Sequence, residues 1–214
     1  MEKVIRIVVQ CWRRRLGSLA SALLSHGKLR RSILSAAPWF AVLLCLSATS
    51  LAQQVHPTES QVKAAYLFNF GKFVQWPLDH GSGGDSFELC VLGQDPFGPV
   101  LDATVAGESI SVRKITVKRI SKMSEGTSCN ILYISVSEAG RLGPILEAAR
   151  HSGTLTVSDI PHFVERGGVI GFVKQQDKIR FEVNRGAAEN SHLTLSSELL
   201  KVALRVVNKD TAKK

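Results

Sequence analysis

Apolar residues recur at helical spacing in the first strongly patterned stretch of the chain, residues 59–74. The apolar positions fall near the i, i+3, i+4 places that line one face of a helix: Val62, Ala65, Tyr66, Phe70 and Phe73. Thr58 precedes the stretch in the place of an N-cap, and Pro77 follows it as a stop signal. The pattern therefore predicts a helix from Glu59 to about Val74.

Short apolar runs bounded by turn residues follow this helix and are typical of buried strands. The predicted strands are 87–92, 109–113, 116–120, 130–136, 154–157, 169–174 and 178–183. Gln175, Gln176 and Asp177 join the last two runs, which predicts a hairpin.

Helical segments are predicted between several of these strands. Asp95 stands as an N-cap before Pro96, at the first position of a short helix. A second helix is predicted over 137–150, and a final helix runs from 196 or 197 to 207. This alternation predicts an α/β fold: a three-layer single domain with a mixed, mainly parallel sheet and a C-terminal hairpin plus helix.

The N-terminal residues predict export. Lys28, Arg30 and Arg31 stand before an apolar run over 33–46, and Ser50 and Ala52 form a cleavage site before residue 53. We therefore expect a cleavable signal peptide with an extended basic n-region over 1–52, a periplasmic domain over 53–208 and a flexible tail over 209–214. The alternative is an uncleaved anchor, because 33–52 is long enough to span a bilayer.

The basic charge of the chain belongs largely to this leader. The whole chain has a formal net charge of +9, but eight of its 27 Lys and Arg residues and one of its 18 Asp and Glu residues lie in 1–52. The remainder carries 19 basic against 17 acidic residues, or +2. No basic stripe with interleaved aromatic residues remains, so nucleic acid is excluded as a partner.

Four cysteines are present, of which Cys11 and Cys45 lie in the leader. Cys90 and Cys129 remain, each on or beside an apolar strand-like run, and in an oxidising compartment such a pair indicates one disulfide. The alternative is two buried free thiols. The spacing is not Cys-x-x-Cys, which disfavours a thiol-disulfide oxidoreductase.

The sequence disfavours two kinds of chemistry. A metal site could use His151, His162, His192, Asp159 or Glu165, but no H-x-x-x-H or H-E-x-x-H pair exists. A paired-carboxylate enzyme could use Asp159 with Glu165 or Glu182, yet a helix cap, a solvated helix face and a strand-end acid explain these residues better. We therefore expect no catalytic residue, no metal and no cofactor.

Binding is the favoured role for the remaining polar residues. In mainly parallel sheets, ligands sit where strands release their carboxyl ends into loops, which here are 93–97, 135–138 and 158–162. The candidate ligand or partner residues are Asp159, His162, Glu182, Asn184 and Arg185. Capping of the next turn by Asn184 and Arg185 is the alternative, and it is favoured for those two.

Several runs of the chain resemble a known family. The opening run VKAAYLFNFGKFVQWP covers 62–77, and the closing runs are GGVIGFV over 167–173, IRFEVN over 179–184 and LSSELL over 195–200. Together they are similar, in order, to the YfiR family of periplasmic proteins over nearly all of the chain after the leader.

The resemblance implies a homodimeric, non-enzymatic periplasmic domain that binds and represses the periplasmic part of an inner-membrane signalling protein, a diguanylate cyclase. It further implies an outer-membrane lipoprotein that relieves the repression. Cys90 and Cys129 match one family disulfide, and a second has no counterpart because no cysteine follows Cys129. Glu182 lies in a region that the family links to small-molecule binding.

An interface is expected at the exposed end of the opening helix, although its spacing indicates mainly core. The candidate interface residues are Tyr66, Phe70, Phe73 and Trp76. The alternative function is a periplasmic small-ligand-binding module that serves a sensor kinase or a transporter.

Overall fold

The computed structural model describes residues 56–77, 86–125, 128–150 and 152–208. The predicted leader over 1–52, the tail over 209–214 and His151 lie outside the described residues. The helices are α3 (Glu59–Phe73), α4 (Pro99–Val105), α5 (Leu142–Ala149), α6 (Arg185–Asn190) and α7 (Ser197–Val202), with 3-10 helices η1 (Met123–Glu125) and η2 (Val136–Arg141). The strands are β1 (Val74–Gln75), β2 (Ser86–Leu92), β3 (Ser109–Ile110), β4 (Arg113–Ile120), β5 (Ile131–Ile134), β6 (Leu155–Ser158), β7 (Ile170–Gln175), β8 (Lys178–Asn184), β9 (Thr194–Leu195) and β10 (Arg205–Val207).

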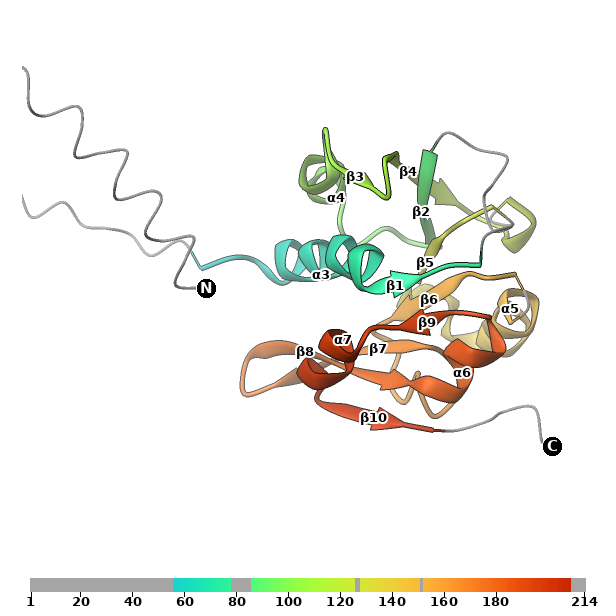
Figure 1. Ribbon diagram of the computed structural model, residues 1–214. Coiled ribbons are helices and arrows are strands. Elements are labelled where there is room, and N and C mark those ends of the chain that lie inside the picture. Colours follow the sequence, from blue (N-terminus) through green and yellow to red (C-terminus); the bar gives the residue numbers. More distant parts are fainter. Residues whose placement is uncertain (1–55, 78–85, 126–127, 151, 209–214) are drawn as a thin grey trace, which may run out of the picture. The chain divides into compact units, whose positions relative to one another are not determined.

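An eight-stranded sheet organises the described residues, in the order β10-β8-β7-β6-β5-β2-β4-β3 (Figure 1). Strands β4, β2, β5, β6 and β7 run parallel, β3 and β8 are antiparallel to their neighbours, and β10 runs parallel to β8. Strands β1 and β9 form a separate antiparallel ribbon. The predicted α/β fold with a mixed, mainly parallel sheet is confirmed.

Successive side chains of a strand point to opposite faces of the sheet, so both faces carry apolar residues, and helices cover both. On one face, Val91, Tyr133 and Val157 share a core with α3, α4, α6 and α7. On the other face, Leu92 and Ile134 pack with α5. All four residues of the central strand β5 are buried, as expected for a parallel strand covered on both sides. The arrangement is the predicted three-layer domain.

Helix α3 begins where the sequence predicted. Thr58 and Gln61 form a capping box: the Gln61 backbone N–H donates to Thr58 Oγ1 at 3.3 Å, and the Thr58 backbone N–H donates to Gln61 Oε1 at 2.7 Å. The buried face of the helix carries Phe70, whose ring centroid lies 5.1 Å from that of Phe181 and 5.9 Å from that of Phe172. This ring packs helix α3 against the β7–β8 hairpin, and burial of one such ring stabilises by about 1.5–3 kcal/mol.

The predicted hairpin is confirmed as β7 and β8, which pair antiparallel with Gln175 opposite Lys178. The two residues between them, Gln176 and Asp177, have φ values of 48° and 57°. Positive φ at both central residues is what a two-residue type I′ turn requires.

Three predicted helices differ from the structure. Asp95 does not cap a helix at Pro96; its carboxylate accepts from the Phe97 backbone N–H at 2.7 Å, and α4 begins only at Pro99. The helix predicted over 137–150 is a 3-10 turn followed by α5. The final helix ends at Val202, and Arg205–Val207 instead form strand β10 on the open edge of β8.

The predicted disulfide between Cys90 and Cys129 is present. The two Cα atoms lie 5.9 Å apart and both residues are fully buried. Cys90 lies on β2, and Cys129 precedes β5, the neighbouring parallel strand. Glu88 lies beside the bridge and accepts from Lys118 Nζ and Ser128 Oγ, both at 2.5 Å. Burial raises the pKa of Glu88, but these two hydrogen bonds outweigh it and leave the pKa below its ordinary value.

Candidate functional site

A cavity of about 440 Å³ lies at the carboxyl ends of β2, β5 and β6. Its lining comes from three loops that follow parallel strands, where ligands are expected in such sheets. The lining residues are Gln94, Asp95, Pro96, Tyr133, Ser135, Val136, Ser137 and Asp159. All three loops that the sequence singled out contribute to this cavity.

Asp159 follows β6 and is the candidate residue that the structure places in the cavity. Its Oδ1 accepts from the Tyr133 hydroxyl at 2.8 Å, and its Oδ2 accepts from Lys63 Nζ at 2.7 Å. Lys63 is only 7% exposed, although it comes from α3, and its ammonium also contacts Glu59 at 2.5 Å. The carboxylate is thus fixed from two other elements of the fold.

The ionisation of this network follows from its contacts. Burial by itself lowers the pKa of Lys63, but its hydrogen bonds and charge pairing with Asp159 and Glu59 outweigh it, so the pKa lies above its ordinary value. Burial raises the pKa of Tyr133, and the nearby carboxylates, Asp159 first, raise it further. Lys63 therefore stays charged and Tyr133 stays a hydrogen-bond donor at neutral pH.

A second carboxylate of the cavity lining is that of Asp95. Its Oδ2 accepts from Arg119 Nε at 2.9 Å. The same guanidinium contacts Asp102 at 2.5 Å and the Gly98 carbonyl at 2.9 Å, which joins the β2 loop to α4. Asp95 is therefore a fixed acceptor at the cavity, although it is not the helix cap that the sequence predicted.

Two of the strand-end loops are in direct contact. Ser137 Oγ accepts from the Gln94 backbone N–H at 3.0 Å. Gly93 has φ of +88°, and a Cβ there would lie 2.5 Å from Ser137 Oγ and 2.7 Å from Glu138 Oε1. A glycine is thus required for this close approach.

Glu182 lies at another place, in a cluster with Glu165 and Arg205. Arg205 donates to both oxygens of Glu182, at 2.9 and 2.7 Å, and also contacts Glu165. The hydrogen bond from Arg205 lowers the pKa of Glu165, so this acid is ionised at neutral pH. One guanidinium pairs with both acids, an arrangement unlike the paired carboxylates of a glycosidase, where one must carry a proton.

Asn184 and Arg185 have partners other than Asp159 and Glu182, whereas His162 lies near the cluster of Glu165, Glu182 and Arg205, where, after the hydrogen bond from Arg205, its charge helps to lower the pKa of Glu165. Asn184 is fully buried; its Oδ1 accepts from the Ala187 backbone N–H at 3.1 Å and caps α6, and its Nδ2 donates to the Val164 carbonyl at 2.9 Å. Arg185 forms an ion pair with Glu189 along α6. His162 is exposed in a turn at φ of +58°.

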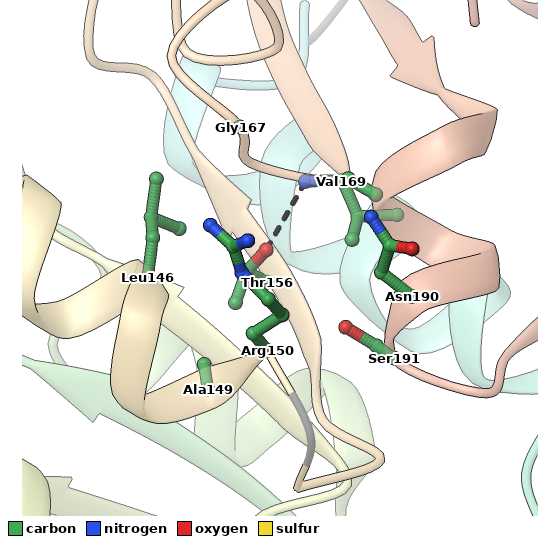
Figure 2. Close-up of a pocket in the computed structure, with 9 residues that line it drawn as sticks. Leu146, Ala149, Arg150, Thr156, Gly167, Val169, Asn190 and Ser191 are labelled. Atoms are coloured by element: carbon green, nitrogen blue, oxygen red, sulfur yellow. Dashed lines mark hydrogen bonds between the residues drawn. The ribbon is translucent and has the colours of Figure 1, made fainter. Parts of the chain in front are cut away.

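Two further hollows lie near α6. One of about 350 Å³ lies among α6, β9 and α7, and Arg185 lines it. The other, shown in Figure 2, lies between α5, β6 and α6 and has room of about 10 Å³, at most one water molecule. In it the Thr156 hydroxyl accepts from the Val169 backbone N–H at 3.1 Å. The charged groups that line the larger hollow, Arg185 and Glu189, are paired with each other, and the smaller hollow has no room for a ligand.

The candidate interface residues divide between core and surface. Phe70 is 1% exposed, and Tyr66 packs against the same core. Trp76 is half-buried, and its indole N–H donates to the Asn130 carbonyl at 3.1 Å. Phe73 alone of the four is exposed, at 41%.

Groups of metal-binding side chains are rare in the part of the chain that the structure describes. One group of three has its donor atoms close together, Glu88 with Cys90 and Cys129, and the two sulfurs are joined in the disulfide. His162 and His192 belong to no such group among these residues.

The features above define a class of protein: a single α/β domain with a polar cavity at its strand ends and with its candidate acids held in ion pairs. The chain belongs to the YfiR/HmsC-like family, whose model matches residues 60–204. That family is regulatory rather than catalytic.

Other comparisons give weaker likenesses. No curated protein matches the chain. A conserved domain protein from Vibrio cholerae is similar at 14% identity and a TM-score of 0.42, over 56% of this chain and 54% of that one. The ABC domain in complex with L-Trp from Streptococcus pneumonia is similar at 11% identity and a TM-score of 0.45, over 67% of this chain and 60% of that one. The chain thus spans little more than half the length of these solved chains. Among the described residues, no helix is long and apolar enough to cross a bilayer.

Proposed function

We propose that the chain is a periplasmic, non-enzymatic regulator that binds and represses the periplasmic part of an inner-membrane signalling protein, a diguanylate cyclase. The family match over residues 60–204 is the observation that carries this proposal. The proposal includes a homodimer and an outer-membrane lipoprotein that relieves the repression.

Export is part of the proposal. Residues 1–52 act as the signal peptide, cleaved after Ala52, and 53–208 form the exported domain with a flexible tail over 209–214. The buried disulfide between Cys90 and Cys129 supports an oxidising compartment, because cytosolic thiols are kept reduced.

The absence of catalysis is supported by what the candidate acids contact. Asp159 is paired with Lys63, and Glu165 and Glu182 share Arg205. The hydrogen bond from Arg205 holds the pKa of Glu165 below its ordinary value, so this acid is a poor proton donor at neutral pH.

The test is the cyclic di-GMP content of cells that lack the gene. Deletion should raise cyclic di-GMP, and expression of the chain with its leader should restore the lower level. The matched control is the same chain without residues 1–52, which stays in the cytoplasm and should restore nothing. An unchanged nucleotide level after deletion would refute repression of a cyclase.

A second function, small-ligand binding for a sensor kinase or a transporter, is favoured by the cavity at the strand ends. Its volume of about 440 Å³ suits a small molecule, and its walls are fixed by ion pairs. A ligand would raise the melting temperature in proportion to the logarithm of its concentration above Kd. A metabolite library that produces no shift would count against this function.

A further inference from the structure

We propose that the cavity at the carboxyl ends of β2, β5 and β6 binds a small organic cation that carries an ammonium group. The proposal deepens the second function, ligand binding, and rests on it. It is independent of whether a cyclase is the partner of the protein.

The shape of the cavity suits such a molecule. Its volume of about 440 Å³ falls within the range of roughly 300–1,000 Å³ that is usual for small-molecule sites. Tyr133, which is buried, contributes its hydroxyl to the lining, whereas Pro96 and Val136 are exposed and offer apolar contacts. A short hydrocarbon chain with a charged end would match both kinds of surface.

The charges around the cavity favour a cation. Asp159 lines the cavity, and behind it Asp159 and Glu59 share the single ammonium of Lys63, which leaves a formal charge of −1. Asp95 also lines the cavity, and Asp95 and Asp102 share the single guanidinium of Arg119, which again leaves −1. Two negative clusters that each place one carboxylate in the lining attract a cation and repel an anion.

Acceptor atoms remain available on both lining carboxylates. A carboxylate has about four acceptor positions. Asp159 accepts one hydrogen bond from Lys63 and one from Tyr133, and Asp95 accepts one from Phe97 and one from Arg119. Each carboxylate can therefore accept from a bound ammonium without losing the contacts that hold it.

A metal ion is a poorer occupant than an organic cation. In the described residues, no three metal-binding side chains of this cavity bring their donor atoms together. Fixed carboxylates on separate loops suit a molecule that spans the space, since a metal ion needs its ligands within one coordination sphere.

The test compares three probes of similar length: putrescine, butane-1,4-diol and succinate. The protein is produced from the full chain, purified as the host processes it, and titrated by calorimetry and NMR. Putrescine should bind saturably, and the neutral diol and the anionic succinate should not. The Gln94→Lys variant should bind putrescine at least about tenfold more weakly, because a fixed cation at the cavity repels the ligand.

Gln94→Lys should fold normally because the side chain is exposed, and the matched control is Gln75→Lys, an equally exposed position on β1 outside the cavity lining. The control should bind putrescine as the wild type does. Absence of putrescine binding, equal binding of the diol, or equal weakening in both variants would overturn the proposal. If putrescine fails but another metabolite gives a melting shift that Gln94→Lys removes, ligand binding stands and the cation proposal falls.

Discussion

Replacing both Cys90 and Cys129 with alanine should lower the stability of the domain by about 4 kcal/mol. The two residues are 39 positions apart, and the loop-closure model assigns about 4 kcal/mol to a crosslink over a loop of that length. Both positions are fully buried, so alanine leaves no unsatisfied polar group there, whereas serine would. For a domain of roughly 150 residues this corresponds to a fall in Tm of about 8–16 °C.

The assay is thermal unfolding followed by circular dichroism, with protein recovered from the periplasm of the expression host. Dithiothreitol should lower the Tm of the wild type toward that of the double alanine variant and leave the variant unchanged. Mass analysis of the unreduced wild type should show no free thiol. Two free thiols, or a double variant that melts within about 2 °C of the wild type, would refute the reasoning.

Three further changes test other parts of the structure. Lys63→Met removes the ammonium from the carboxylate at the end of β6 and should lower the free energy of unfolding in urea by about 1–3 kcal/mol; a loss below about 0.5 kcal/mol contradicts a structural role for the pair. The pKa of Glu88 is lowered in the fold, so the wild type should exceed Glu88→Gln in Tm at pH 7 and lose this advantage progressively as the pH falls from about 4.3 through the lowered pKa; a difference in Tm that does not shrink at all below about pH 4 contradicts this. Gly168→Ala would place a Cβ 2.1 Å from the Phe163 ring and should cost about 1–3 kcal/mol, whereas Gly143→Ala, with nothing within 4 Å, should be neutral in the same urea assay.

Local sequence patterns predicted the elements whose ends are marked by nearby residues. Helix α3 was predicted because its periodicity, its cap at Thr58 and its stop signal agree. The end of the last helix was wrong because Leu204 and Val207 also fit a helical period. The β-branched pair Val206–Val207 suits a strand equally well. In the structure these residues form β10, because they pair with the open edge of β8 and because two acids hold Arg205 there. That edge is built by distant residues, so no local pattern reports it.

The candidate site was predicted in part. Ligands bind at the carboxyl ends of parallel strands, and this rule depends on strand direction alone. It was therefore enough to predict the three loops that line the cavity, and Asp159 within one of them. Lys63 was missed, since it is 96 residues from its partner in sequence. The sequence does indicate that Lys63 is buried, because it lies four and seven residues before Leu67 and Phe70 and so shares their helix face. A lysine on such a face requires a buried anion, although nothing in the sequence says which one.

The order of strands in the sheet bears on how the chain could fold as it emerges, N-terminus first, from an export channel. Strands β4 to β8 each pair with a strand that has already appeared, so most of the sheet can grow one strand at a time. Helix α3 is different, because its Tyr66 and Phe70 pack on Phe172 and Phe181, which are about 100 residues later in the chain. Helix α3, the first helix among the described residues, is therefore among the last to be covered, and until the hairpin arrives its aromatic face is open to proteases, chaperones and other emerging chains.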